Sequence, residues 1–265
     1  MALSTAMSAR SDVLVLCYHA VSEDWPAALS ATPAALEAQL RFLVERGYEG
    51  ATFHEAVTDP PAAKTLAVTF DDAYRSVLTR GEPILRSLGL VGTVFVPTAH
   101  AGSDAPMAWP GIDGWLGGPH EEELLPLSWE ELRRLADLGW EIGSHSRTHP
   151  RLPELDDAAL TQELEDSRGE CERRLEQPCR TVAYPYGAED DRVVRATAEA
   201  GYEAAAALSS RLSHGDPLRF PRIGIYHSDS AREFALKVHP AVRRMRGSPL
   251  AHVAFAARQA LRGRP

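Results

Sequence analysis

The feature that most constrains the fold is a series of short strand candidates, the first of them almost wholly apolar, separated by segments with helical periodicity. The seven candidates cover residues 13–17, 66–70, 92–96, 140–143, 180–184, 202–206 and 219–225. A strand that is apolar throughout is typical of a parallel sheet, in which both faces are covered. The alternation predicts an α/β architecture with a parallel sheet, either a barrel or an open sheet.

Helix starts between these runs carry recognisable capping signals. They lie at Thr32 with Pro33, at Ser128 with Glu131, and at Asp156 or Asp157. A hydroxyl or carboxylate side chain can accept a hydrogen bond from the free N–H groups of the first turn. In such a fold, chemistry is expected at the carboxyl ends of the strands.

Composition narrows the class of protein. The 265 residues are 44% hydrophobic and 25% charged, which suits one domain with a large core. The net charge of -9 gives no reason to expect a nucleic-acid partner, because phosphate binding needs a concentrated basic surface. Three cysteines without C-x-x-C spacing favour a reducing compartment. The first residues resemble no signal peptide, so a cytoplasmic location is expected.

The end of the chain differs from the rest in charge. Residues 232–265 contain eight Lys or Arg and a single Glu. Within 249–265, apolar residues recur at helical spacing beside Arg258, Arg262 and Arg264, which predicts a basic amphipathic helix. Docking on the domain is the ordinary expectation for such a helix. Peripheral contact with an anionic membrane or with a partner enzyme is the sharper alternative.

Two adjacent carboxylates, Asp71 and Asp72, follow directly on the apolar run 66–70. Successive side chains point in different directions, so one acid can bind a cation while the other faces a substrate or water. A plain turn with a helix-capping Asp is the alternative interpretation.

A pair of histidines, His145 and His149, follows the strand candidate 140–143. Imidazoles four residues apart can converge on one metal if the residues between them make a helical turn. Pro150 disfavours the α conformation for His149, so a single turn at the strand end is expected. With Asp72, the two histidines make a set of three ligands with open positions. Zinc suits this set, although Fe2+ or Co2+ would also fit.

Two further strand ends carry polar groups. Tyr186 lies between Pro185 and Gly187, where a rigid turn could aim a backbone N–H into a cleft. His19 follows the first strand candidate and should therefore reach the same mouth. The Gly- and Pro-rich segment 101–126 is expected to be a long loop over that mouth. Its tryptophans could stack on sugars, but anchoring the loop is their commoner use.

Three motifs together resemble the NodB-type polysaccharide deacetylases, carbohydrate esterase family four. They are Thr69-Phe-Asp-Asp72, His145-Ser-Arg-Thr-His149 and Tyr184-Pro-Tyr-Gly187, in this order. The resemblance implies a distorted (β/α) barrel with about seven parallel strands, formed by a catalytic domain over residues 1–248. It also implies a divalent metal held by Asp72, His145 and His149.

The resemblance further implies that Asp71 is the general base and that the backbone N–H of Tyr186 stabilises the oxyanion. Two departures from the family pattern stand out. Many members have an arginine where Ala183 stands, and Arg222 is the candidate substitute. No convincing Leu-x-His motif is found near the C-terminus, where many members keep their acid histidine. The Tyr18-His19 pair is similar to a rearranged subgroup in which the acid comes from the first strand, so His19 is the candidate general acid.

The function that follows is removal of the N-acetyl group from an N-acetylhexosamine unit of a polysaccharide, glycolipid or glycan precursor. Hydrolysis of a non-sugar amide or imide is one alternative, because the same chemistry attacks any accessible carbonyl. An inactive carbohydrate-binding relative is another, although binding alone needs no base beside a metal site.

Overall fold

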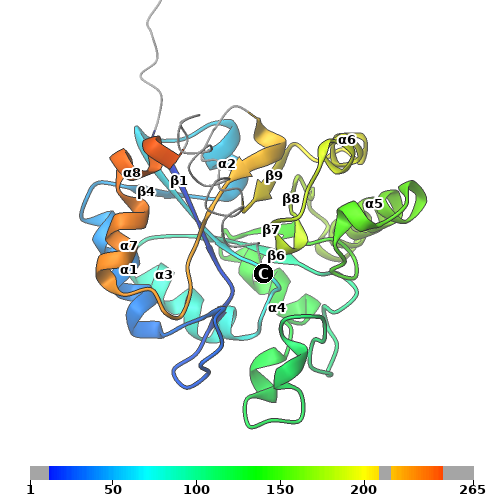
Figure 1. The fold of residues 1–265 in the computed structure, drawn as a ribbon, viewed down its shortest axis with the longest axis horizontal. Helices are drawn as coiled ribbons and strands as arrows, with labels where there is room; N and C mark the ends of the chain where they lie inside the picture. Colours follow the sequence, from blue (N-terminus) through cyan, green and yellow to red (C-terminus); the bar gives the residue numbers. More distant parts are fainter. Residues whose placement is uncertain (1–11, 209–215, 247–265) are drawn as a thin grey trace, which may run out of the picture.

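The computed structural model describes residues 12–208 and 216–246. A sheet of parallel strands curls into a nearly closed barrel with helices around it (Figure 1). The strands are β1 (Asp12–Tyr18), β4 (Glu49–Ala51), β5 (Lys64–Phe70), β6 (Gly92–Val96), β7 (Glu141–Ser144), β8 (Thr181–Ala183), β9 (Ala204–Ala207), β10 (Phe220–Pro221) and β11 (Ile223–Gly224). The order β10-β9-β8-β7-β6-β5-β1-β11 confirms the predicted barrel.

The barrel closes through one short segment that the sequence predicted as a single strand. Residues 219–225 divide into β10, which pairs with β9, and β11, which pairs with β1. Pro221 has no N–H to donate to a ladder, and the next residue, Arg222, donates its backbone N–H to Ala207 O at 3.0 Å. The segment therefore joins the two ends of the sheet and turns Arg222 toward the inside.

The helices begin where the capping signals predicted. The α-helices of the described residues are α1 (Pro33–Val44), α2 (Phe53–Thr58), α3 (Glu82–Ser87), α4 (Trp129–Asp137), α5 (Asp157–Leu175), α6 (Asp191–Glu199), α7 (Ala231–Val238) and α8 (Pro240–Arg246). Thr32, Ser128 and Asp156 each accept a hydrogen bond from the first turn of α1, α4 and α5. Among the helices of residues 12–208 and 216–246, none is both long and apolar enough to span a bilayer.

Shorter elements connect these parts. They are β2 (Ala20–Val21), β3 (Ser30–Ala31), the π-helix η1 (Val77–Gly81), and the 3₁₀ turns η2 (Asp113–Trp115), η3 (Glu121–Leu124), η4 (Leu152–Glu154), η5 (Pro185–Gly187) and η6 (Pro217–Arg219). Neither the β2–β3 pair nor β4 was predicted. Both β2 and β3 are only two residues long, and β4 has three residues, so their sequences show no clear periodicity.

Side-chain alternation along the strands separates the barrel interior from the helix-covered outside. On β1, Val13 and Val15 belong to the inner cluster, whereas Leu14, Leu16 and Tyr18 pack in the larger core beneath the helices. The inner cluster is built mostly of alanines and three rings, and helix α2 supplies one of those rings, Phe53. It therefore fills the amino-terminal half of the barrel, which is called the base below.

The same alternation decides which side chains reach the carboxyl-terminal end, called the mouth below. Continuing the inward series of β1 gives Cys17, and continuing that of β5 through Ala67 and Thr69 gives Asp71. Cys17 and Thr69 are register partners on the neighbouring strands. Topology alone therefore places a thiol and a carboxylate next to each other at the top of the barrel interior.

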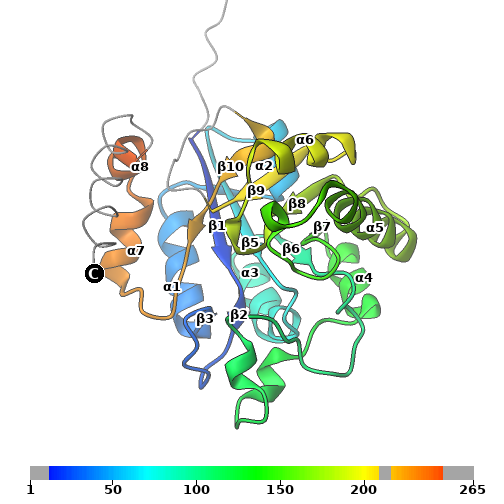
Figure 2. The ribbon, with the colours of Figure 1, turned by 45° about the vertical axis from the view of Figure 1, so that its right-hand side comes forward.

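The loop over residues 101–126 extends beyond the mouth, as predicted, and lies beside the β2–β3 pair (Figure 2). Ser22 donates a hydrogen bond to Glu123 at 2.6 Å, and the rings of Trp25 and Trp115 meet edge to face at 5.8 Å. These contacts tie the loop to the segment that follows β1.

The basic helix predicted for residues 249–265 lies outside the described part of the chain. The catalytic domain expected over residues 1–248 also extends beyond the last described residue, Arg246.

Candidate metal centre and active site

The residues singled out in the sequence follow strands that end at one mouth of the barrel. Asp71 and Asp72 follow β5, His145 follows β7, Tyr186 follows β8, His19 follows β1, and Arg222 lies between β10 and β11. Parallel strands that share a mouth bring together residues that are far apart in the sequence, such as His19 and Arg222. The structure thus brings residues of all three motifs to one site, together with the two candidate substitutes, Arg222 and His19.

Three of these side chains converge on a single point. The Nε2 atom of His145 lies 3.4 Å from Asp72 Oδ1, and the Nε2 atom of His149 lies 3.3 Å from the same oxygen. Two ligands bound to one tetrahedral zinc at 2.0–2.1 Å are separated by about 3.3 Å. The spacing therefore matches a shared cation, and it is longer than an ordinary hydrogen bond.

The chemistry of these atoms also fits a cation. All three side chains are buried, and Asp72 Oδ1 has no hydrogen-bond partner among the residues that the structure describes, which is costly for a buried carboxylate. Burial lowers the pKa of His145 to about 4, so this imidazole is neutral at physiological pH. Its Nδ1 contacts Ala183 O at 2.8 Å, which places the proton on Nδ1 and leaves Nε2 as a ligand.

The turn that carries His149 is not the helical turn expected from the spacing. Ser146 and His149 both have positive φ, at 60° and 62°. The Ser144 and Ser146 hydroxyls accept hydrogen bonds from the backbone N–H groups of Ser146 and His149, each at 3.1 Å. The two histidines therefore converge through a left-handed turn held by serine side chains, with Pro150 preventing an α conformation at its end.

Glu163 on α5 braces this turn and was not found from the sequence. Its Oε2 accepts hydrogen bonds from the N–H groups of Arg147 and Thr148 at 2.8 Å each, and its Oε1 accepts one from Thr148 Oγ1 at 2.6 Å. A glutamate in a charged helix gives no distinguishing signal, because most such residues only face solvent.

Asp71 forms a bidentate ion pair with Arg222. Nη1 lies 2.6 Å from Oδ1 and Nη2 lies 2.8 Å from Oδ2, and both side chains are almost completely buried. Burial by itself would raise the pKa of Asp71, but the charge of Arg222 holds it well below its ordinary value. Many family members have an arginine at the position of Ala183. In this chain Arg222, which lies between β10 and β11, contacts the Asp71 carboxylate instead.

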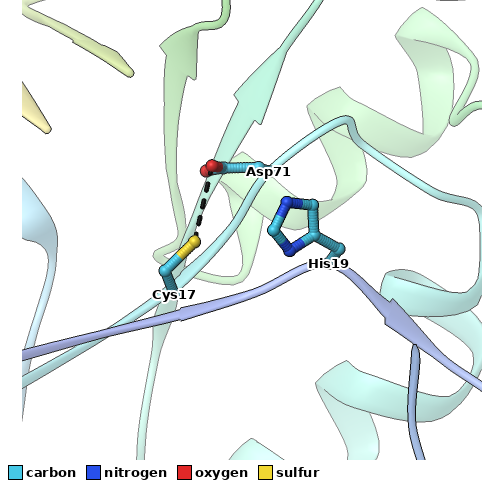
Figure 3. Close-up of side chains that lie close together, drawn as sticks. All are labelled: Cys17, His19 and Asp71. Atoms are coloured by element: carbon cyan, nitrogen blue, oxygen red, sulfur yellow. Dashed lines mark hydrogen bonds between the residues drawn. The ribbon is translucent and has the colours of Figure 1, made fainter. Parts of the chain in front are cut away.

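His19 lies beside Asp71 and Cys17 (Figure 3). The Cys17 thiol donates a hydrogen bond to Asp71 Oδ2 at 3.4 Å. One ring nitrogen of His19, the Cys17 sulfur and an Asp71 oxygen all lie within 4.8 Å of one another. Burial raises the pKa of the Cys17 thiol well above its ordinary value, so it stays protonated in this arrangement.

Aromatic rings surround His149. The ring of Trp109 stacks on His149 at 4.2 Å between centroids, and the ring of Tyr186 meets it at 4.7 Å with an interplanar angle of 63°. Trp109 is only 7% exposed. The loop over the mouth therefore uses Trp109 to anchor itself on His149, which leaves little of that ring for stacking on a sugar.

Backbone strain is concentrated at this site. Within residues 12–208 and 216–246, positive φ occurs at six non-glycine residues. One of them, Glu176, ends α5 in the usual left-handed cap. The other five are Asp72, Ala73, Ser146, His149 and Tyr186. Such conformations cost about 1–3 kcal/mol each and cluster where function requires them.

Comparisons with known proteins agree with this geometry. The model of the family described as polysaccharide deacetylase matches residues 58–205, which is more than half of the chain. The chain therefore belongs to the polysaccharide deacetylase family.

Among relatives, YxkH of Bacillus subtilis (strain 168), named as a candidate polysaccharide deacetylase, is 25% identical over 194 residues. That match covers 71% of this chain and 62% of YxkH. A poly-β-1,6-N-acetyl-D-glucosamine N-deacetylase of Staphylococcus aureus (strain MSSA476) is 22% identical over 223 residues, which cover 78% of this chain and 71% of the relative.

A solved structure shares the fold. The crystal structure of BC0361, a polysaccharide deacetylase from Bacillus cereus, superposes with a TM-score of 0.69 and 26% sequence identity. The superposition covers 86% of this chain and 69% of BC0361. The barrel described here is thus a fold already known for this family.

Proposed function

We propose that this protein is a metal-dependent deacetylase that removes the acetyl group from an N-acetylhexosamine unit of a glycan. The observation that carries the proposal is the convergence of Asp72, His145 and His149 beside a second carboxylate, Asp71, that an arginine holds in place. Three protein ligands leave coordination positions open, which is typical of catalytic and not of structural metal sites.

Zinc is the proposed metal, because two imidazoles and one carboxylate are among its preferred ligands. When bound, such an ion lowers the pKa of a water molecule and polarises the acetyl carbonyl. His145 is prepared for this role, since its pKa of about 4 and its contact with Ala183 O leave Nε2 with a free lone pair.

Asp71 is the proposed general base. Arg222 keeps its carboxylate ionised and fixes both oxygens, so the group is ready to accept a proton from the attacking water. The second oxygen, Oδ2, lies 4.0 Å from His145 Nε2, and this places the base next to the metal ligands.

His19 is the proposed general acid, which donates a proton to the departing amine. It is partly exposed at the mouth and lies beside Asp71, where a substrate nitrogen could reach it. The backbone N–H of Tyr186 is the proposed oxyanion donor, and its left-handed conformation, with φ of 59°, supports this assignment because it departs from that of a continuing strand.

A β-1,6-linked N-acetylglucosamine oligomer is the first substrate to test. The S. aureus relative is named for acting on that polymer, and it also supplies the only linkage named among the relatives described above. The experiment measures acetate release from a panel of N-acetylated sugars and from cyclic imides, with and without a chelator.

Chelator-sensitive acetate release from at least one sugar is expected. If the protein hydrolysed only imides, its substrate would be a non-sugar imide and not an N-acetylated sugar. Binding of sugars without release of acetate would contradict catalysis and point to an inactive carbohydrate-binding protein.

A further inference from the structure

We propose that Cys17, His19 and Asp71 form a second, inhibitory metal site that takes a thiophilic divalent cation such as Cd2+ or excess Zn2+. These three residues are distinct from Asp72, His145 and His149, and each contributes one ligand atom to a group that lies within 4.8 Å (Figure 3). A thiol, an imidazole and a carboxylate are together a ligand set that favours zinc or a softer ion over Mg2+ or Ca2+.

The distances suit such an ion. Cys17 Sγ lies 3.4 Å from Asp71 Oδ2, and one Zn–S bond of 2.3 Å with one Zn–O bond near 2.0 Å in tetrahedral geometry gives about 3.5 Å. His19 faces this pair, and its Nδ1 is buried with no hydrogen-bond partner in the described part of the chain. A cation bound through Nδ1 would satisfy this nitrogen.

Binding requires the Cys17 proton to leave. Sγ–H loses its proton to solvent, and the resulting thiolate, one His19 nitrogen and one Asp71 oxygen each donate a lone pair to the ion. Asp71 Oδ2 already accepts a hydrogen bond from Arg222 Nη2 at 2.8 Å, but a carboxylate oxygen has two lone pairs. No oxidant or reductant takes part.

Repulsion by neighbouring positive charges should make the affinity of this second site for a cation lower than that of the first. The guanidinium of Arg222 is in contact with Asp71, and a cation already held by Asp72 would add further repulsion. The second site therefore fills only when metal is in excess. This order distinguishes it from the site that we propose for catalysis.

Occupancy would stop turnover, because the ion occupies lone pairs of Asp71 and His19. This consequence rests on the base and acid roles proposed above, whereas binding itself does not. Excess zinc or cadmium should therefore inhibit, and removal of the excess should restore activity.

The test adds Cd2+ to protein that already holds one equivalent of zinc and records the ultraviolet thiolate-to-metal charge-transfer band together with acetate release. The first site contains no sulfur, so exchange of cadmium into it produces no band. The expected result is a band that saturates at one equivalent while activity is lost over the same concentrations, and Mg2+ should produce neither effect.

Two matched variants identify the cysteine that supplies the sulfur ligand. Cys17→Ser should abolish the band, and Cys171→Ser, which changes another buried free cysteine, should retain it. His19→Ala should weaken cadmium binding in the same spectroscopic assay. Circular dichroism and zinc content check that each variant is folded.

No band in the wild type, or a band that persists in Cys17→Ser, would overturn the proposal. The spectroscopic result does not depend on turnover. A band in a protein that deacetylates no sugar would leave the second site standing and remove only the proposed function.

Discussion

The mouth and the base of the barrel each hold an arginine against an aspartate, but the surroundings of the two pairs differ. At the mouth, Arg222 and Asp71 are nearly inaccessible, with 0% and 2% of their side chains exposed. At the base, Arg243 contacts Asp12 at 2.7 Å, and 32% of the Asp12 side chain is exposed. Both arginines come from the last described segment, residues 216–246, and connect it to Asp12 in β1 and to Asp71 directly after β5.

The base satisfies its polar groups, whereas the mouth does not. Asp12 also accepts a hydrogen bond from Tyr48 Oη at 2.6 Å, and Arg243 donates to Val13 O at 2.5 Å. At the mouth, several buried polar atoms have no partner among residues 12–208 and 216–246: Asp72 Oδ1, His149 Nδ1, His19 Nδ1 and Arg222 Nε. In barrels of this kind the mouth carries chemistry and the base carries stability, and we expect this chain to follow that division.

The largest expected difference between the two ends concerns their aspartates. Asp71→Asn should lower turnover by about 10³-fold, because it removes the proton acceptor. Asp12→Asn should leave turnover close to that of the wild type. Steady-state kinetics on an N-acetylglucosamine oligomer measure both, and an equal loss in the two variants would contradict the division.

The two arginines should differ in their effect on stability. Arg222→Met leaves Asp71 buried without a cationic partner, which should cost about 3–5 kcal/mol of the free energy of unfolding. Arg243→Met leaves Asp12 with Tyr48 and with solvent, and about 1 kcal/mol is expected. Urea unfolding of the metal-free proteins gives both values, and similar losses would show that the mouth pair is no more isolated from water than the base pair.

A histidine at each end offers the next comparison. His19→Ala should reduce kcat by about 10²-fold while zinc content stays near one equivalent, because the departing amine loses its proton donor. His54, which contacts Glu203 at 2.7 Å near the base, is the matched control, and its replacement by Ala should not affect kcat. Unchanged turnover in His19→Ala would exclude its role as the acid.

The smallest effect is expected at two glutamates that each hold backbone N–H groups. Glu163→Gln weakens the support of the turn between the two histidines, and zinc affinity should fall about tenfold. Glu141→Gln alters the base, where Glu141 accepts a hydrogen bond from His54 N at 2.9 Å, and should leave zinc affinity unchanged. Competition with a zinc indicator measures both, and equal affinities would remove Glu163 from the support of the site.

The alternation of apolar strand candidates with capped helices predicted a parallel α/β fold, and the resemblance to a known family favoured the barrel over the open sheet. The sequence also pointed to Asp72, His145 and His149, since strand ends carry chemistry in such folds. It could not predict the division of residues 219–225, which depends on pairing with two distant strands. Nor could it predict the left-handed turn before Pro150, because the Glu163 hydrogen bonds that brace the turn exist only once α5 has packed against β7.

The position of Cys17 is another feature that the sequence could not predict. As one of three scattered cysteines it carries no motif, and only the strand register with Thr69 brings its thiol to Asp71. Register sets contacts across a sheet, and it is not encoded in any local segment.

Zinc titration of the metal-free protein tests the central claim most directly, with acetate release from a β-1,6-linked N-acetylglucosamine oligomer as the readout. The rate should rise in proportion to added zinc, reach a maximum at one equivalent, and remain absent in Asp72→Asn. A rate that is independent of zinc, or that rises equally in Asp72→Asn, would contradict a catalytic metal held by Asp72, His145 and His149.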